Sequence, residues 1–249
     1  MSARADAPAP TGAPSRNPGR AEDALRVTVA LFVGVLITSN FIAAKLITVG
    51  GLVVPAAVLV FPLAYIIGDV LTEVFGYAAA RKAIWLGFAC NVVAVAFSHL
   101  AIALPPAGAW TLRPFPDTAS SQVAFAAVLG PAPRIVAASL AAYLCGEFLN
   151  SIVLAKLKVA TGGRFLWVRT IGSTLVGQLA DSAVFITAAF AGTVPGGVLR
   201  DIVLVQWLVK VGFEAAATPG TYLVVWRLKR AVGVEHFDTR VSFNPLRWE

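Results

Sequence analysis

Hydrophobic residues follow one another in this chain in runs much longer than the strands or amphipathic helices of a water-soluble domain. A bilayer core about 30 Å thick is crossed by about 20 apolar residues in helical conformation, and six runs reach that length. They predict membrane-spanning helices over residues 26–48, 52–75, 83–104, 134–155, 171–192 and 202–226. Because ten-residue segments of alternating polarity are missing, a β-barrel is not expected. The pattern therefore predicts an all-α integral membrane protein with six transmembrane helices.

The composition agrees with this class. The chain has 249 residues, of which 58% are hydrophobic and 13% charged, whereas soluble domains carry about 25% charged residues. A net charge of +7 can indicate nucleic-acid binding, but here the basic residues gather in alternate connections and at both ends: Arg16, Arg20, Arg26, Arg81, Lys82, Lys156, Lys158, Arg164, Arg169, Arg227, Lys229 and Arg230. Basic residues collect on the cytoplasmic side of membrane proteins. Both termini are therefore expected in the cytoplasm, and no nucleic-acid partner is expected.

Three parts are expected along the chain. Residues 1–24, rich in Pro, Ala and Arg, predict a disordered extension. Residues 25–228 form the transmembrane domain, and residues 229–249 form a cytoplasmic tail without a recognisable module.

Two connections have distinct features. A turn at Gly50 and Gly51 is expected to join the first two spans tightly. The longest connection, 105–133, contains an apolar piece at 122–129 that is too short to cross the bilayer. It predicts either a lid-like or interfacial helix, or a flexible loop with Trp110 at the membrane interface.

Polar residues inside the spans indicate a functional site, because an ionisable group costs about 2.5–3.5 kcal/mol at the centre of a membrane helix. Steps of three and four place polar residues on one face of each of the last three spans. At about 1.5 Å per residue, these groups and one amide of the first span fall close to mid-membrane. We therefore predict a substrate-binding cavity lined by Asn40, Glu147, Asn150, Gln178, Asp181, Lys210 and Glu214.

The alternative is that these groups only hold helices together through hydrogen bonds and ion pairs. Lys210 would then neutralise Glu214 or Asp181. Within the spans, however, five acids face two lysines, so pairing among them cannot satisfy every carboxylate. The surplus carboxylates are expected to be protonated, hydrated or available to a ligand that donates hydrogen bonds.

The second span carries its acids nearer the cytoplasm. Asp69 is expected to form the floor of the cavity or part of an inner gate, and Glu73 to pair with Arg81 or Lys82. Lys45, Asp69, Glu73 and Arg81 together form a predicted set of gate or structural polar residues.

Several other kinds of chemistry are not expected. His99 and His236 are isolated in the sequence, so no metal site is predicted, and no cofactor is expected. A phosphate-binding loop of the GxxxxGK[ST] type is missing, so any ATP drive would come from a partner. An intramembrane aspartyl-type enzyme, pairing Asp69 with Asp181, is a remote alternative.

Several segments resemble the queuosine precursor transporter family, which is also called the vitamin uptake transporter family. They are SNFIAAKL (39–46), GDVLTEVFG (68–76) followed by Arg81 and Lys82, EFLNS (147–151), RTIGSTLVGQLADSAVF (169–185) and KVGFEAAATP (210–219). The resemblance covers about residues 25–228 and is most specific in the second and fourth of these segments.

The resemblance implies a six-helix protein of the bacterial inner membrane, similar to the S component of energy-coupling-factor transporters. It implies import of 7-deazaguanines, such as 7-cyano-7-deazaguanine and 7-aminomethyl-7-deazaguanine, for tRNA queuosine salvage. A 7-deazaguanine presents a ring N–H beside an amine, and one carboxylate can accept from both. The alternatives are an S-component-like binding module or an importer of another vitamin or heterocycle. An energising partner and a homo-oligomer both remain open.

Overall fold

The computed structural model describes residues 18–42, 45–49, 52–130, 133–192, 195–233, 236–239 and 241–247. The long helices are α1 (Pro18–Ile42), α3 (Tyr77–Ala103), α5 (Pro133–Ala160), α6 (Leu166–Phe190) and α7 (Gly196–Val232). The short elements are strands β1 (Leu46–Val49) and β2 (Leu52–Pro55), the 3₁₀ turn η1 (Ala56–Leu59), helix α2 (Phe61–Val70), the π-helical turn η2 (Leu71–Phe75) and helix α4 (Thr118–Leu129).

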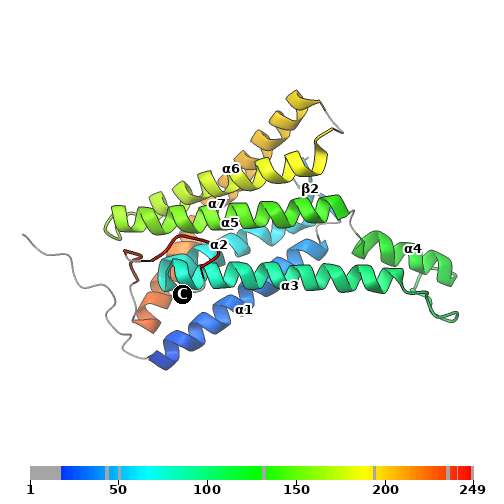
Figure 1. The fold of residues 1–249 in the computed structure, drawn as a ribbon, viewed down its shortest axis with the longest axis horizontal. Helices are drawn as coiled ribbons and strands as arrows, with labels where there is room; N and C mark the ends of the chain where they lie inside the picture. The colour runs from blue at the N-terminus through cyan, green and yellow to red at the C-terminus, as the bar shows by residue number, and fades with distance from the viewer. Residues whose placement is uncertain are drawn as a thin grey trace, which may run out of the picture.

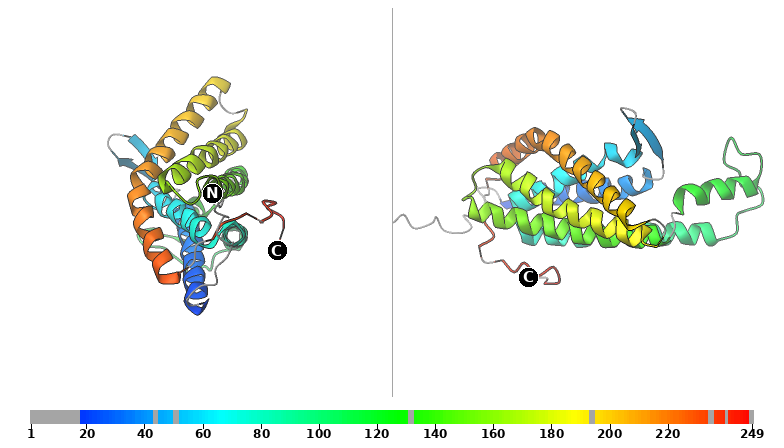
Figure 2. Two further views of the ribbon diagram at one scale, coloured as in Figure 1. Left: turned by 90° about the vertical axis from the view of Figure 1, so that its left-hand side faces the viewer. Right: turned by 90° about the horizontal axis from the view of Figure 1, so that it is seen from above.

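The long helices lie side by side in one bundle, with α2 enclosed among them (Figure 1). The start of α1 and the C-terminal tail lie at one end, which we call the tail end (Figures 1 and 2). The β1–β2 hairpin and α4 lie at the opposite end, the hairpin end. Within the described residues, five helical stretches are long and apolar enough to cross a membrane: Gly19–Ile42, Tyr77–Ala103, Thr118–Ala160, Leu166–Phe190 and Gly196–Val232.

The predicted boundaries of the first two spans are wrong. We expected helix up to residue 48 and again from residue 52, but α1 ends at Ile42, and β1 pairs antiparallel with β2 so that Val49 lies opposite Leu52. The segment is rich in β-branched residues, which pack well on a pleated strand and lose rotamer freedom in a helix. An apolar run therefore continues through a hairpin, and α2 begins only at Phe61, with a proline in its first turn.

The second helix is short and changes its winding. α2 continues into the π-helical turn η2, which ends at Gly76 with φ of 84°. A side chain there would be strained, and its Cβ would also lie 2.2 Å from Cδ2 of His236. Single π turns inside membrane and soluble helices often mark functional positions. Thr72, Glu73 and Val74 of this turn are buried.

Helices α5 and α6 approach each other closely at two glycines. A Cβ on Gly177 would lie 2.7 Å from Cβ of Asn150, and a Cβ on Gly146 would lie 2.7 Å from Cβ of Asp181. Small residues allow membrane helices to pack backbone against backbone. The same two glycines therefore bring polar side chains of α5 and α6 together in the interior.

The other expected segments are described in part. A helix over the apolar piece at 122–129 is confirmed as α4, whose first turn is capped by Asp117 accepting from the backbone N–H of Ser120 at 2.7 Å. Of the expected disordered extension, residues 18–24 are helical and belong to α1, while residues 1–17 lie outside the described residues. The expected turn residues Gly50 and Gly51 also lie outside them.

The C-terminal tail packs back on the beginning of α3. The buried carboxylate of Asp238 accepts from the backbone N–H of Tyr77 through both oxygens, each at 3.1 Å. The indole Nε1 of Trp85 donates to the carbonyl of Pro245 at 2.8 Å. The hydroxyl of Tyr77 donates a hydrogen bond to the carbonyl of Phe243. The guanidinium of Arg81 donates to the carbonyls of Ser242 and Asn244. The tail is thus part of the folded structure at this end.

Candidate functional site

A cavity of about 360 Å³ lies among the helices and is lined by residues of all seven α-helices. This volume is within the usual range of small-molecule pockets, roughly 300–1,000 Å³. Apolar side chains form most of its wall, including Leu36, Val95 and Phe185. The polar side chains that line it are Ser39, Asn40, Tyr65, Asn91, Ser98, Ser139, Tyr143, Glu147, Gln178, Asp181, Gln206 and Lys210.

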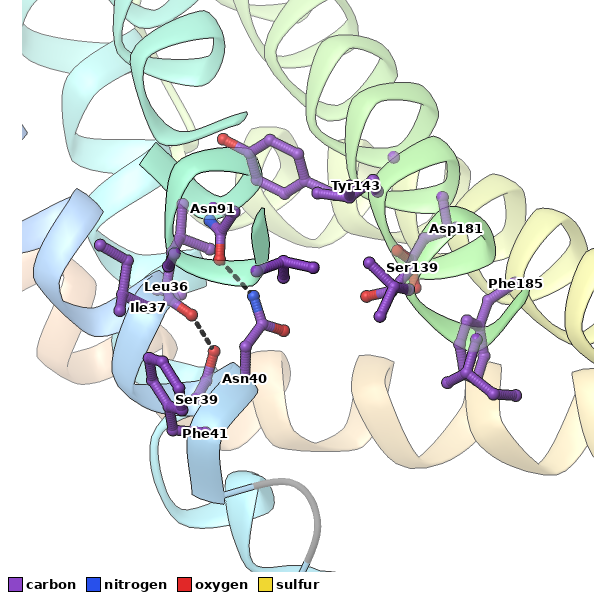
Figure 3. Close-up of a pocket in the computed structure, with 18 of the residues that line it drawn as sticks. Leu36, Ile37, Ser39, Asn40, Phe41, Asn91, Ser139, Tyr143, Asp181 and Phe185 are labelled. Atoms are coloured by element: carbon purple, nitrogen blue, oxygen red, sulfur yellow. Dashed lines mark hydrogen bonds between the residues drawn. The ribbon is translucent and has the colours of Figure 1, made fainter. Parts of the chain in front are cut away.

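The wall formed by α1 and α3 carries an amide pair. Asn40 Nδ2 donates to Asn91 Oδ1 (Figure 3). Asn91 Nδ2 donates in turn to the carbonyl of Gly87 at 2.8 Å. This chain of bonds fixes the rotamers of both amides and joins the two helices across the cavity wall. The amide of Asn40 is therefore held in one orientation at the cavity.

The opposite wall is formed by α5, α6 and α7 and carries the charges. Lys210 Nζ donates to Asp181 Oδ2 in an ion pair whose side chains are about one-fifth exposed. Glu147 is buried, and no described residue donates a hydrogen bond to its carboxylate. Gln178 is buried beside them, and its Oε1 accepts nothing from the described part of the chain. The cavity thus has the Asn40–Asn91 amide pair on one side and Asp181 on the other (Figure 3), with Glu147, Gln178 and Lys210 on the same wall as Asp181.

Five of the seven predicted binding residues therefore lie around one cavity: Asn40, Glu147, Gln178, Asp181 and Lys210. The other two lie elsewhere. Asn150 donates through Nδ2 to Asp69 Oδ1 at 2.9 Å, and both residues are buried. Glu214 is 1% exposed, and neither carboxylate oxygen has a partner among the described residues.

Glu73 has different partners from those we predicted. Its buried carboxylate contacts Arg169 Nη2 at 2.8 Å, Lys229 Nζ at 2.8 Å and Lys158 Nζ at 3.6 Å. The predicted partner Arg81 instead donates to carbonyls of the tail, and Lys82 is exposed. The turn at Gly76 redirects the chain before α3, so residues only eight or nine positions after Glu73 point away from it.

The predicted set of gate residues is also dispersed. Lys45 lies just before β1 at the hairpin end and is exposed, because α1 ends before reaching it. Glu73 and Arg81 lie at the tail end. Asp69 lies one turn of helix before Glu73, hydrogen-bonded to α5.

Some cavity and cluster residues were not predicted from the sequence. Tyr143 lies one turn before Glu147 on α5 and donates its hydroxyl to the carbonyl of Ile84 at 3.0 Å. We expected Lys158 and Arg169 in a connection between two spans, yet both side chains are almost completely buried. A signal for Arg169 was present, because it continues the four-residue spacing of Ser173, Gly177 and Asp181 on one face of α6.

The site has the features of a membrane transporter. A polar cavity is enclosed by membrane-spanning helices, and within the described residues there is no group of three or more His, Cys, Asp and Glu side chains that could hold a metal ion. The two aspartates of the aspartyl-enzyme alternative are engaged separately, Asp69 by Asn150 and Asp181 by Lys210.

Comparison with known proteins specifies the family. Residues 55–224 match the family model described as "Putative vitamin uptake transporter", and the chain belongs to this family. It is 28% identical over 187 residues to the "Probable queuosine precursor transporter" of Bacillus subtilis (strain 168), covering 75% of this chain and 78% of that protein. It is 27% identical over 156 residues to the "Queuosine precursor transporter" of Escherichia coli (strain K12), covering 63% of this chain and 64% of that protein. No solved structure matches.

These relatives are transporters, and this chain is a transporter rather than an enzyme. With its several apolar membrane-spanning helices, it is a multi-pass protein of the bacterial inner membrane.

Proposed function

We propose that this protein imports queuosine precursors, 7-deazaguanines such as 7-cyano-7-deazaguanine and 7-aminomethyl-7-deazaguanine, through the cavity described above. The names of its two relatives support this class of substrate. The observation that carries the proposal is the state of Glu147, a buried carboxylate at the cavity without a hydrogen-bond donor among the described residues. A buried carboxylate that is left unpaired is costly unless a ligand supplies the donors.

The edge of a 7-deazaguanine supplies such donors. Its ring N–H and the neighbouring amine point in the same direction, so a carboxylate accepts from both at once. Of the three carboxylates among the predicted binding residues, Asp181 is paired with Lys210, and Glu214 does not line the cavity. Glu147 is therefore our candidate for the donor edge, with Gln178 and Lys210 beside it and the fixed amide of Asn40 facing from the opposite wall.

A flat heterocycle also needs apolar faces. Aromatic rings of Tyr65, Tyr143 and Phe185 line the cavity from α2, α5 and α6. Aromatic and apolar surfaces hold a planar ring by stacking and by removing it from water. The combination of a carboxylate, amides and rings supports a hydrogen-bond-rich heterocycle as the substrate class.

We further propose six crossings with both termini in the cytoplasm. The described start of α1 and the tail lie at the same end of the bundle, which requires an even number of crossings (Figure 1). Among the described residues, five helical stretches are long enough to cross, and α2 with η2 supplies a shorter sixth crossing between the hairpin end and the tail end. The tail end carries the basic residues Lys158, Arg169 and Lys229 and is assigned to the cytoplasm. This topology is that of the S components that the sequence resembles.

Uptake of radiolabelled 7-cyano-7-deazaguanine tests the proposal in a bacterial strain that cannot make queuosine precursors. Wild-type protein should restore both uptake and queuosine in tRNA. The substitution Glu147→Gln removes a charge-assisted hydrogen bond of about 1.5–3 kcal/mol, so substrate affinity should fall by about 10- to 100-fold. Asp201→Asn, at an exposed carboxylate paired with Arg200, is the matched control and should transport normally.

The same assay separates the alternatives. Uptake of a labelled vitamin of another class, with no uptake of the 7-deazaguanine, would assign the cavity to another heterocycle. Purified protein in liposomes decides the question of a partner, because an S-component-like module would bind the substrate without accumulating it. If Glu147→Gln were expressed normally and transported like wild type, the assignment of Glu147 would be wrong.

A further inference from the structure

The cavity extends over only one part of the bundle. On α5 and α7, which run from the hairpin end toward the tail end, its lining residues fall within 135–147 and 206–210 (Figure 1). On α3 and α6, which run the opposite way, they fall within 91–98 and 178–185. Among the described residues, each of these segments reaches from the hairpin side only to the middle of its helix. A molecule in the cavity must therefore still cross the tail-end half of the bundle to pass through the protein.

Helices α2 and α5 meet at the cavity. Gly68 of α2 lies against the carboxylate of Glu147, because a Cβ on this glycine would be 3.3 Å from Glu147 Oε2. The next residue of α2, Asp69, accepts through Oδ1 from Asn150 Nδ2 at 2.9 Å. Asn150 follows Glu147 by about one turn of α5, in the direction of the tail end. The contact between the two helices thus begins at the proposed substrate carboxylate and leads away from the cavity.

The same contact continues along η2. Thr72 Oγ1 donates to Ser151 Oγ at 3.2 Å. Nearer the tail end, Lys158 Nζ donates to the backbone carbonyl of Glu73 and lies 3.6 Å from Glu73 Oε1. We call this row of pairs the α2–α5 seam; from the cavity to the tail end, its members are Gly68–Glu147, Asp69–Asn150, Thr72–Ser151 and Glu73–Lys158. The seam runs into the half of the bundle that the cavity does not reach.

The seam consists of groups that suit an aqueous path. Apart from Gly68, every member is polar and buried: Asp69, Thr72, Glu73, Glu147, Asn150, Ser151 and Lys158. Polar and ionisable groups inside membrane proteins commonly mark the pathways of substrates. Asp69 Oδ2 and Asn150 Oδ1 also lack a donor among the described residues. Water entering between the two helices would supply these donors and replace the hydrogen bonds that are broken.

The backbone beside the seam has the features of a hinge. The residues of η2 are wound as a π-helix, and the turn ends at Gly76 with φ of 84°. Local π-helical winding is frequent at functional positions, and hinges are a few residues at the ends of elements that absorb changes in backbone angles. The seam residues of α2 and η2 can therefore move relative to α5 without bending α3.

Glu73 has cations on both sides of the seam. Arg169 approaches it from α6, which packs along α5, and Lys229 approaches it from α7, which packs on α2. If η2 moves away from α5 together with α7, the carboxylate keeps Lys229 as a partner at 2.8 Å. A buried carboxylate that loses all of its partners is costly, and this arrangement avoids that cost during opening.

We propose that the α2–α5 seam is the closed exit path of the transporter, through which the substrate leaves the cavity when α2 and η2 separate from α5. Passage toward the cytoplasm rests on the proposed function and topology. The opening of the seam rests only on the position of the cavity in a protein that transports. Glu147 belongs to both the cavity and the seam, so a substrate bound to its carboxylate lies at the first contact that must open.

A disulfide bond across the seam tests this path. The hydroxyl oxygens of Thr72 and Ser151 are 3.2 Å apart, which places Thr72→Cys and Ser151→Cys within reach of a disulfide that joins Cβ atoms about 3.5–4.5 Å apart. The native cysteines are first removed by Cys90→Ala and Cys145→Ala. After oxidation with copper phenanthroline, the full-length double variant should still bind 7-cyano-7-deazaguanine but lose its uptake into liposomes. Reduction with dithiothreitol should restore uptake.

The control for oxidation is the protein with Cys90→Ala and Cys145→Ala alone, which should transport equally before and after the oxidant. A structural contact that never opens can be cross-linked without any loss of transport. Fully cross-linked protein that takes up the compound as fast as its reduced form therefore overturns the proposal.

Thiol labelling provides a second measurement that needs neither the cross-link nor a known substrate. Ser151→Cys, in the background without native cysteines, replaces one small side chain by another. A membrane-impermeant thiol reagent should label it from the tail-end side of the membrane, and 7-cyano-7-deazaguanine should increase the rate. A cysteine that is never labelled from that side, with or without the compound, overturns the proposal. If wild type does not take up the compound although this cysteine is labelled, the proposed substrate is wrong and the exit path stands.

Discussion

Arg169 forms a bidentate ion pair with Glu73 inside the bundle: its Nη2 lies 2.8 Å from Glu73 Oε1, and its Nε lies 3.2 Å from Glu73 Oε2. Both side chains are almost fully enclosed. Lys158 and Lys229 approach the same carboxylate from α5 and α7, so one acid joins η2 to three long helices. Charges buried in this way are costly when they lose their partner.

Glu73→Gln should therefore strongly destabilise the protein. The substitution leaves three cations around a neutral amide, and breaking a buried pair typically costs about 3–5 kcal/mol. The midpoint of unfolding of the purified protein in detergent should therefore fall to a lower temperature or denaturant concentration. Arg200→Gln is the control, because the exposed Arg200–Asp201 pair should contribute about 1 kcal/mol or less. Equal stability of the two variants would show that the Glu73 cluster does not hold the helices together.

Gly177→Ala should weaken both stability and transport. Its Cβ would lie 2.7 Å from Cβ of Asn150, so α5 and α6 must separate, at a cost of about 1–3 kcal/mol. Gly34→Ala is the matched control, since a Cβ there meets nothing within 4 Å, and alanine should stabilise the helix slightly. Thermal unfolding and uptake should both distinguish the two variants. Similar behaviour would mean that α5 and α6 are not packed through this glycine.

The beginning of α4 should depend on pH. The backbone N–H of Ser120 donates to Asp117, and this bond and the hydroxyl of the same serine hold the pKa of Asp117 below its ordinary value. A lowered pKa in the folded state means that the cap is fully present at neutral pH and is lost as the pH falls through that pKa. Hydrogen exchange in the first turn of α4, corrected for its intrinsic pH dependence, should show weaker protection in acid. In Asp117→Asn, protection should be nearly independent of pH over the same range.

Asp238→Ala should loosen the start of α3. Gly76 offers no side-chain cap to this helix, and Asp238 supplies the acceptor from the tail instead. Loss of a helix cap typically costs about 0.5–2 kcal/mol. Fluorescence of Trp85, whose indole donates to Pro245 of the same tail, should report the change during unfolding. Asp201→Ala, which changes an exposed acid, should leave the unfolding transition unchanged. If both variants unfolded like wild type, the tail contacts would not contribute to stability.

Much of the helical arrangement could be predicted from the sequence, because uninterrupted hydropathy is a strong signal for membrane helices. The predicted spans 83–104, 134–155 and 202–226 fall almost wholly inside α3, α5 and α7. The spacing of Glu147, Gln178, Asp181 and Lys210 predicted that they lie close together, and the structure gathers them around one cavity. Their role in binding remains a prediction.

Other features could not be predicted because their signals are weak or non-local. The β1–β2 hairpin has the same hydropathy as a membrane helix, and only its β-branched residues distinguish it. Lys158 and Arg169 stand at helix ends, where basic residues usually face water, so their burial against Glu73 was not evident. Glu214 and Asn150 share helical faces with the cavity residues Lys210 and Glu147, but neither lines the cavity, and Asn150 instead donates to Asp69.

The contact between Asp238 and Tyr77 has a consequence for how the protein is made. The N–H of Tyr77 belongs to the third crossing of the proposed topology, whereas its acceptor lies 161 positions later, after α7. During synthesis, α3 must enter the membrane with its first turn uncapped, and the cap can form only once every later helix has been inserted. A chain that loses its tail would therefore leave the N–H of Tyr77 without this acceptor, however completely its helices had been inserted.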